Sequence, residues 1–239
     1  MLDRINTFRW QSITETLLNA LKRFPVAATA TIGLCISLLL LVNLPYEQVK
    51  GSILYEPSYW YVWVGALPLA ASIVLCFENR LNPTIRHSVS LLAVLLWSLY
   101  GYISNDTPEH FFGALAFIAP IVTFFSSLFW VAFLKKDTDT SFWNFSYLLC
   151  IQILTGLLFA SVLAAGLSLA LFSTDTLFGC EFKSEMYSNI HVLCYTLFFP
   201  FYLLGNIPIA SITETKARSF AQAWKILGLY ILLPLLILY

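Results

Sequence analysis

The chain has 239 residues, of which 59% are hydrophobic and only 11% are charged, and its mean hydropathy is +0.78. A soluble domain carries about 25% charged residues, so this chain has too little polar surface to enclose its apolar residues in water. The formal net charge is zero, which gives no reason to expect a nucleic-acid partner. The composition therefore predicts an integral membrane protein whose main partner is the lipid bilayer.

Residues 1–23 precede the first apolar run and carry an amphipathic helical pattern. The segment lacks the apolar core and the small-residue cleavage site of a signal peptide. Basic residues near both ends suit a helix that lies on the anionic inner leaflet. The same pattern also suits a helix packed on the cytoplasmic loops of a bundle, and both interpretations stay open. The apolar residues of the pattern are Ile5, Phe8, Ile13, Leu17, Leu21 and Phe24.

Uncharged apolar runs then divide the chain into about seven membrane crossings. A bilayer core about 30 Å thick needs roughly 20 apolar residues in helical form. Backbone polar groups cannot stay unpaired in lipid, which excludes open strands. We therefore expect an all-α, polytopic transmembrane helix bundle that forms a single domain over residues 24–239. The predicted spans lie near residues 24–44, 60–77, 88–103, 111–134, 148–172, 187–207 and 224–239.

The distribution of lysine and arginine predicts how these spans are threaded. With the N-terminus in the cytoplasm, eleven of the 13 basic residues fall on the cytoplasmic side, and only Lys50 and Lys183 fall outside. Cytoplasmic loops carry an excess of lysine and arginine, so this bias favours that orientation and makes the seventh helix run outward. The cytoplasmic basic residues are Arg4, Arg9, Lys22, Arg23, Arg80, Arg86, Lys135, Lys136, Lys216, Arg218 and Lys225.

The fifth apolar run, residues 141–174, is too long for one simple crossing, because its helix would reach roughly 50 Å. We expect an interfacial stretch around Trp143 and Tyr147, followed by a crossing over residues 148–172. Small residues recur there every four positions, which lets two helices approach closely. Two interpretations stay open: packing inside the bundle, or contact with a second copy in a homo-oligomer. This helix-packing face consists of Gly156, Ala160, Ala164 and Ser168.

Proline residues occur within several spans, where they are expected to kink the helices. Each removes a backbone hydrogen bond, and broken helices line the binding sites of many transporters. Proline is also commoner in membrane helices than in soluble ones, which leaves an ordinary structural role open. No Asp, Glu, Lys or Arg lies deep within the first six spans, which argues against proton relays and ion-coupled carriers. The prolines are Pro68, Pro120, Pro200 and Pro234.

The loops predicted to lie outside hold carboxylates and imidazoles that would bind a divalent metal if the loops converged. Their spacing matches no metal-binding helix such as HExxH, and the sequence contains no GxSxG and no phosphate-binding glycine loop. Ordinary solvated loops are also polar, so we assign no catalytic residue, no metal site and no cofactor. The members of this outer-face polar cluster are Asp106, Glu109, His110, Glu181, Glu185 and His191.

Three elements in the second half of the chain form a recognisable series. They are Phe-Trp-x-Phe at residues 142–145, Leu-Phe-Gly at residues 177–179, and the stretch "LFFPFYLLGNIP". The series resembles a bacterial family of polytopic membrane proteins catalogued as domain of unknown function four-one-five-three, with Ser146 where that family usually has asparagine. The resemblance covers about residues 110–239. It implies a bacterial cytoplasmic (inner) membrane, no agreed activity, and further spans after the helix that reaches Tyr239.

Three functional hypotheses follow. The first is a component of membrane transport, or of a pathway for lipids or neutral solutes, and it requires a cavity or lateral groove near Pro68, Pro120 and Pro200. The alternative is a non-catalytic membrane scaffold, sensor or assembly subunit, which the small-residue face of the fifth span would serve. An enzyme ranks last, because the sequence shows no catalytic constellation.

Thiol-reactive reagents test the predicted threading. A membrane-impermeant reagent added outside is expected to label Cys180, which the orientation places in an outer loop. A cysteine introduced at Lys135 should react only after the membrane is opened. Labelling is measured by mass spectrometry in intact and permeabilised cells, and the opposite pattern would overturn the orientation.

Overall fold

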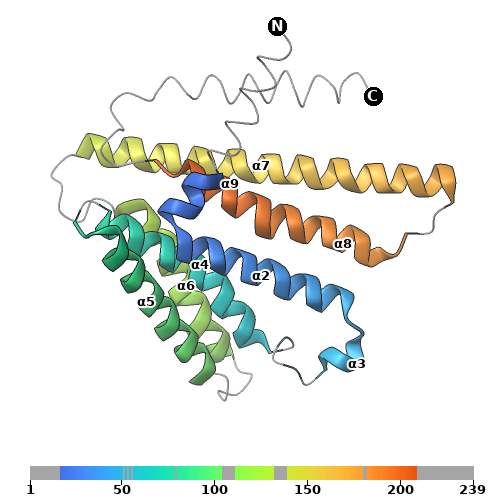
Figure 1. Ribbon diagram of the computed structural model, residues 1–239, viewed down its shortest axis with the longest axis horizontal. Helices are drawn as coiled ribbons and strands as arrows, with labels where there is room; N and C mark the ends of the chain where they lie inside the picture. Colours follow the sequence, from blue (N-terminus) through green and yellow to red (C-terminus); the bar gives the residue numbers. More distant parts are fainter. Residues whose placement is uncertain are drawn as a thin grey trace, which may run out of the picture.

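The computed structural model describes residues 17–50, 52, 54, 56–78, 80–103, 111–131, 139–179 and 182–208. These residues form helices and no strands, as the apolar runs predicted (Figure 1). The helices are α2 (Pro25–Asn43), α3 (Tyr46–Val49), α4 (Pro57–Phe77), α5 (Pro83–Ile103), α6 (Phe111–Trp130), α7 (Asp139–Phe178), α8 (Ser184–Val192), the π-helix η4 (Leu193–Phe198) and α9 (Phe199–Asn206).

Four helical segments of the described residues are long and apolar enough to cross a membrane: Pro25–Asn43, Tyr59–Phe77, Phe145–Phe178 and Ser184–Asn206. They correspond to the predicted first, second, fifth and sixth spans, and they are compatible with a membrane protein. The third and fourth predicted spans are helical, as α5 and α6, but neither is among the four. The seventh, residues 224–239, lies outside the described residues. The expected count of about seven spans is therefore not confirmed.

The described part of the predicted amphipathic helix, residues 17–23, is helical. Its Ala20 is buried, whereas Leu17, Leu18 and Leu21 are exposed. Phe24 interrupts the helix before Pro25 begins α2. Residues 1–16 of this predicted segment lie outside the described residues.

The fifth apolar run forms one uninterrupted helix, α7, of 40 residues. A helix of this length extends about 60 Å, roughly twice the thickness of a bilayer core. The structure shows no break between the expected interfacial stretch and the expected crossing over residues 148–172. In its first turns Trp143 is 69% exposed whereas Phe145 is fully buried, so this end of α7 packs one face against the bundle and leaves the other exposed.

Helix α4 lies at the centre of the first half of the chain, in contact with α2, α5 and α6. Its most apolar window is 50% buried, against 22% for the window of α7. The indole N–H of Trp97 in α5 donates to the carbonyl of Val62 at 3.0 Å. Gly65 makes room for that ring, since a Cβ there would lie 2.7 Å from Trp97 Nε1. Close approach and a polar contact thus join helices that lipid alone would not drive together.

The prolines have different local consequences. Helices α4 and α6 continue through Pro68 and Pro120. Pro200 instead follows the π-helix η4, in which the N–H of Phe199 donates to the carbonyl of Cys194, five residues earlier. A proline ring collides with the carbonyl four residues before it, and a widened turn relieves that collision. Pro234 lies outside the described residues.

The larger apolar core gathers at one end of the bundle, which we call the Arg23 end. Here α2 begins, α7 begins, and α4, α6 and α9 end. The other ends of α2, α7 and α8 fan out to the right in Figure 1. The molecule is therefore tightly packed at the Arg23 end and more open at the opposite end. Fully buried side chains of this core include Phe24, Val74, Phe145, Leu149 and Leu204.

Arg23 joins three helix ends in this core. Its Nε and Nη2 donate to the two carboxylate oxygens of Glu78 at 2.6 and 2.8 Å, at the end of α4. The same guanidinium donates to the carbonyls of Ile207 and Pro208, which follow α9. A carboxylate and unpaired carbonyls at helix C-termini both favour a cation. Arg23 therefore neutralises the ends of α4 and α9 while it anchors the start of α2.

Replacing Arg23 tests this contact. R23Q is expected to lower the free energy of unfolding by about 1.5–3 kcal/mol, because charged hydrogen bonds of this kind are worth that much. That loss corresponds to a fall in Tm of roughly 3–12 °C for a chain of this size. Tryptophan fluorescence during heating in detergent measures it.

The matched control is K22Q, since Lys22 is the exposed neighbour of Arg23. Its Tm should change by no more than about 2 °C. An equal loss in the two variants would contradict the structural role of Arg23.

Candidate functional site

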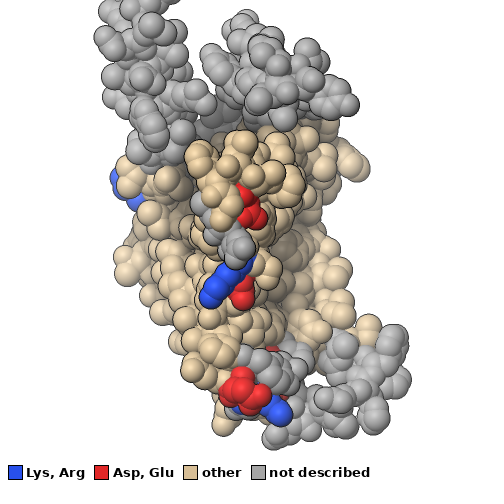
Figure 2. Space-filling model, turned by 90° about the vertical axis from the view of Figure 1, so that its right-hand side faces the viewer, with Lys and Arg blue, Asp and Glu red and all other residues tan. Residues whose placement is uncertain are grey.

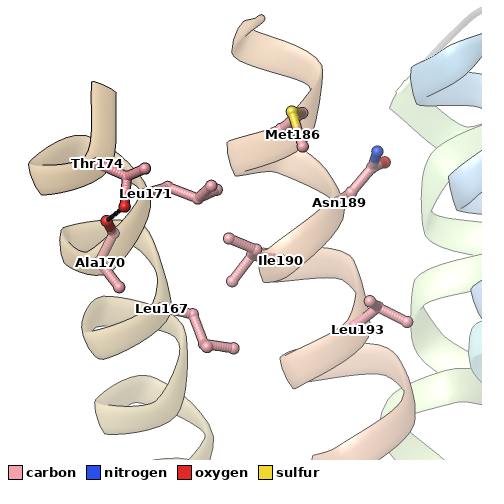
Figure 3. Close-up of a pocket in the computed structure, with 8 residues that line it drawn as sticks. All are labelled: Leu167, Ala170, Leu171, Thr174, Met186, Asn189, Ile190 and Leu193. Carbon is pink, nitrogen blue, oxygen red and sulfur yellow. Dashed lines mark hydrogen bonds between the residues drawn. The ribbon is translucent and has the colours of Figure 1, made fainter. Parts of the chain in front are cut away.

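A groove of about 460 Å³ lies between α7 and α8, away from the Arg23 end (Figure 3). Leu167 and Leu171 of α7 point toward Ile190 of α8 across it. No charged side chain lines it. The lining consists of Leu167, Ala170, Leu171, Thr174, Met186, Asn189, Ile190 and Leu193.

The groove forms where the close packing of α7 stops. Gly156 lies against α9, since a Cβ there would come within 2.8 Å of Tyr202 Cδ1. Ala160 and Ala164 are 0% and 1% exposed. Gly166 lies on the opposite side of α7 from Ala164, where a Cβ would meet nothing within 4 Å. From this point α7 and α8 diverge (Figure 1), which leaves the groove between them.

Two hydroxyl contacts hold α7 against the π-helix and α9 on the near side of the groove. Tyr195 donates to the hydroxyl of Ser161 at 2.9 Å, and Tyr202 donates to Gln152 at 3.4 Å. Gln152 is the deepest strongly polar residue of the predicted spans, and its partner explains how it is accommodated. These contacts hold α9 and η4 against α7, whereas α8 diverges from α7.

A reciprocal amide pair holds α8 on its other side. Asn43 at the end of α2 donates to Asn189 at 2.8 Å, and Asn189 donates back to Asn43 at 3.0 Å. Asn189 is directed away from α7 in Figure 3. The pair therefore draws α8 toward α2 and keeps the groove open on the α7 side.

The polar atoms of the lining are already paired within the protein. The hydroxyl of Thr174 donates to the carbonyl of Ala170 at 2.8 Å, within its own helix, and the amide of Asn189 is occupied by Asn43. A ligand in the groove would therefore contact mainly methyl and methylene groups. This surface suits an apolar chain and offers little to a charged or strongly polar solute.

The predicted helix-packing face is covered within a single copy of the chain. Gly156 lies against Phe199 and Tyr202, and Ala160 and Ala164 are buried. Ser168, the next member, has a buried hydroxyl without a hydrogen-bond partner. The neighbouring residues Ala165 and Gly166 remain exposed or open.

The groove does not lie where the prolines suggested. Pro68 is fully buried in α4, and neither Pro68, Pro120 nor Pro200 lines the groove. Its residues carry an apolar helical pattern that any membrane helix would show. The one signal in the sequence was the pair Asn43 and Asn189, two amides near the ends of apolar helices.

Only two members of the predicted outer-face polar cluster are described. Glu185 lies in the first turn of α8. The Nδ1 atom of His191 is 2.8 Å from the carbonyl of Tyr187, and its ring stacks on Tyr195. Among the described residues, no group of three His, Cys, Asp or Glu side chains could hold a metal ion. Asp106, Glu109, His110 and Glu181 lie outside the described residues.

The end of the molecule at which α7 ends and α8 begins is mainly uncharged. Figure 2 shows a few acidic and basic residues there, in small separate groups on a largely uncharged surface. The described part of this face therefore offers no concentrated charge to attract an ionic partner.

Comparison with other proteins adds no family. No protein-family pattern matches the chain, and neither a curated protein nor a solved structure is significantly similar to it.

A double-mutant cycle tests the amide pair. N43L and N189L are each expected to lower the free energy of unfolding, and the double variant should lose less than the sum of the two. Hydrogen bonds between membrane helices give coupling energies of about 0.6–1.7 kcal/mol in such cycles.

The control cycle combines N43L with N206L, because the amide of Asn206 donates only within its own helix, to the carbonyl of Tyr202. These two losses should be additive. If the losses of stability in the Asn43–Asn189 cycle are also additive, the two amides do not stabilise the contact between α2 and α8. Stability is measured by thermal unfolding in detergent.

Proposed function

We propose that this protein is a component of membrane transport or of a lipid or neutral-solute pathway, and that the groove between α7 and α8 holds an acyl chain. The observation that carries the proposal is a laterally open, uncharged groove whose polar atoms are already paired. Its volume of about 460 Å³ falls in the range of about 300–1,000 Å³ found for ligand pockets.

The surroundings favour an acyl chain as the occupant. The residues of α7 and α8 that line the groove belong to the apolar segments Phe145–Phe178 and Ser184–Asn206, both long enough to cross a bilayer. In that setting lipid chains are present at the opening of the groove. A methylene group gains little free energy when it moves from the surrounding lipid into an apolar groove. The groove would therefore exchange lipids readily rather than bind one tightly.

We also propose a location and an orientation. The excess of basic residues on one side supports a cytoplasmic N-terminus and an outward-running seventh helix. The resemblance of residues 110–239 to the bacterial family named above supports a bacterial inner membrane. In this orientation the Arg23 end lies in the cytoplasmic half of the membrane and the groove lies in the outer half.

The alternative is a non-catalytic scaffold, sensor or assembly subunit that forms a homo-oligomer through α7. The observation in its favour is the exposed far part of α7, where Leu169 and Phe172 are each 60% exposed and Gly166 faces open space. Small residues there would permit close contact with a second copy. Because Ala170 also lines the groove, a copy seated on this face would compete with a lipid chain.

A photoreactive lipid distinguishes the two. In vesicles that contain phosphatidylcholine with a diazirine in its acyl chain, illumination is expected to label the groove residues Leu167, Leu171 and Ile190. The variant A170W should remove most of this labelling, because Ala170 lines the groove and the indole ring would occupy the space that the acyl chain fills. Mass spectrometry of peptides locates and quantifies the label.

The matched control is A165W, which places the same ring on an exposed part of α7 that does not line the groove. Its labelling should equal that of the unmodified protein. Equal labelling in A170W would remove the acyl-chain proposal. A groove that no lipid labels would favour the homo-oligomer.

A further inference from the structure

Arg86, in the first turn of α5, is a buried residue that has no anionic partner within the part of the chain that the structure describes. Its side chain is only 9% exposed, and its Nε forms no hydrogen bond. It lies one helical turn before Ser90, whose hydroxyl contacts the carbonyl of Ala70 in α4 at 3.3 Å. Arg86 is thus on the face of α5 that packs against α4.

The nearest carboxylate along α4 is already engaged. Glu78, at the end of that helix, uses both of its oxygens for Arg23. A buried Nε–H that lacks an acceptor is unfavourable, since its burial removes water without returning a hydrogen bond. Arg86 therefore marks a position at which an anion would stabilise the protein.

His87 adds a second unsatisfied donor or acceptor beside it. Its Nδ1 is buried and has no hydrogen-bond partner. Burial, and then the charge of Arg86, lower the pKa of His87 from its ordinary value. This shift favours the uncharged imidazole, so His87 is suited to supply a neutral hydrogen-bonding group beside the positive charge of Arg86.

The start of α5 reinforces this positive charge. The helix has 21 residues and begins at Pro83. Its dipole is positive at this end, and the first N–H groups of a helix lack partners within it. Side chains in a helix lean toward its N-terminus, which is the direction expected for the side chain of Arg86. Helix N-termini with a nearby arginine suit phosphate groups.

We propose that Arg86, His87 and the N-terminus of α5 form a binding site for a phosphate group. The site lies immediately before residues 88–103, the predicted third span. Lipid phosphates lie at this level, next to the hydrocarbon core. The same chemistry would also accept free inorganic phosphate. The proposal does not depend on the groove, which lies at the opposite end of the bundle.

The experiment measures Tm of the full chain in an uncharged maltoside detergent under three additions of matched ionic strength. The first is short-chain phosphatidylglycerol, the second is inorganic phosphate, and the third is sodium chloride. A ligand present at about a hundred times its Kd is expected to raise Tm by roughly 5–10 °C. Sodium chloride should give no such rise.

R86M separates binding from stability. Replacing an unpaired buried charge with an apolar side chain of similar length is expected to leave the Tm without added anion unchanged or higher. The rise with phosphatidylglycerol or phosphate should disappear. R80Q is the control, because Arg80 is exposed and lies just before the same helix, and it should keep the full rise. H87F should respond more weakly than the unmodified protein.

The outcomes are distinct. A rise with phosphatidylglycerol alone would identify the ligand as a lipid headgroup, and a rise with both additions would show that a phosphate group suffices. If neither raises the Tm, or if R86M keeps the rise, the site does not exist. None of these results depends on acyl-chain labelling of the groove.

Discussion

The contact on which the packing depends is the Arg23 guanidinium, which binds Glu78 and the carbonyls of Ile207 and Pro208 at once. In lipid the hydrophobic effect does not drive helices together, so polar contacts and close packing must do so. Arg23 joins parts of the chain that are 55 and 184 positions away. The largest apolar core surrounds this point, and the helices spread apart with distance from it.

The openness of the opposite end has an equally local cause. Small residues on α7 allow close contact with the η4–α9 segment as far as Ala164. Beyond that residue, α8 is held by Asn43 of α2 instead. One set of contacts thus holds the η4–α9 segment against α7, the other holds α8 toward α2, and the groove is the space left between α7 and α8. Its apolar lining follows from its position within two segments that are long and apolar enough to cross a membrane.

The two arginines near the ends of α4 and α5 show how differently one side chain can be accommodated. Arg23 has a carboxylate, two carbonyls and the ring of Phe24 at 5.0 Å from its Cζ. Arg86 is more deeply buried and has an unsatisfied Nε. A buried charge is tolerated when the fold supplies opposite charges and hydrogen-bond acceptors for it. The contrast is the reason that a ligand, rather than a structural role, is inferred at Arg86.

The sequence by itself determined the class of the protein and the position of its apolar helices. The first and second spans, expected over residues 24–44 and 60–77, agree closely with Pro25–Asn43 and Tyr59–Phe77, because the thickness of a bilayer sets the length of an apolar run. Only the tertiary structure decided which surfaces meet. The face at Ala160 and Ala164 turned inward, the groove formed away from the prolines, and Asn43 paired with Asn189, 146 positions later. Helical periodicity defines a face, but the partner of that face depends on contacts between segments far apart in the chain.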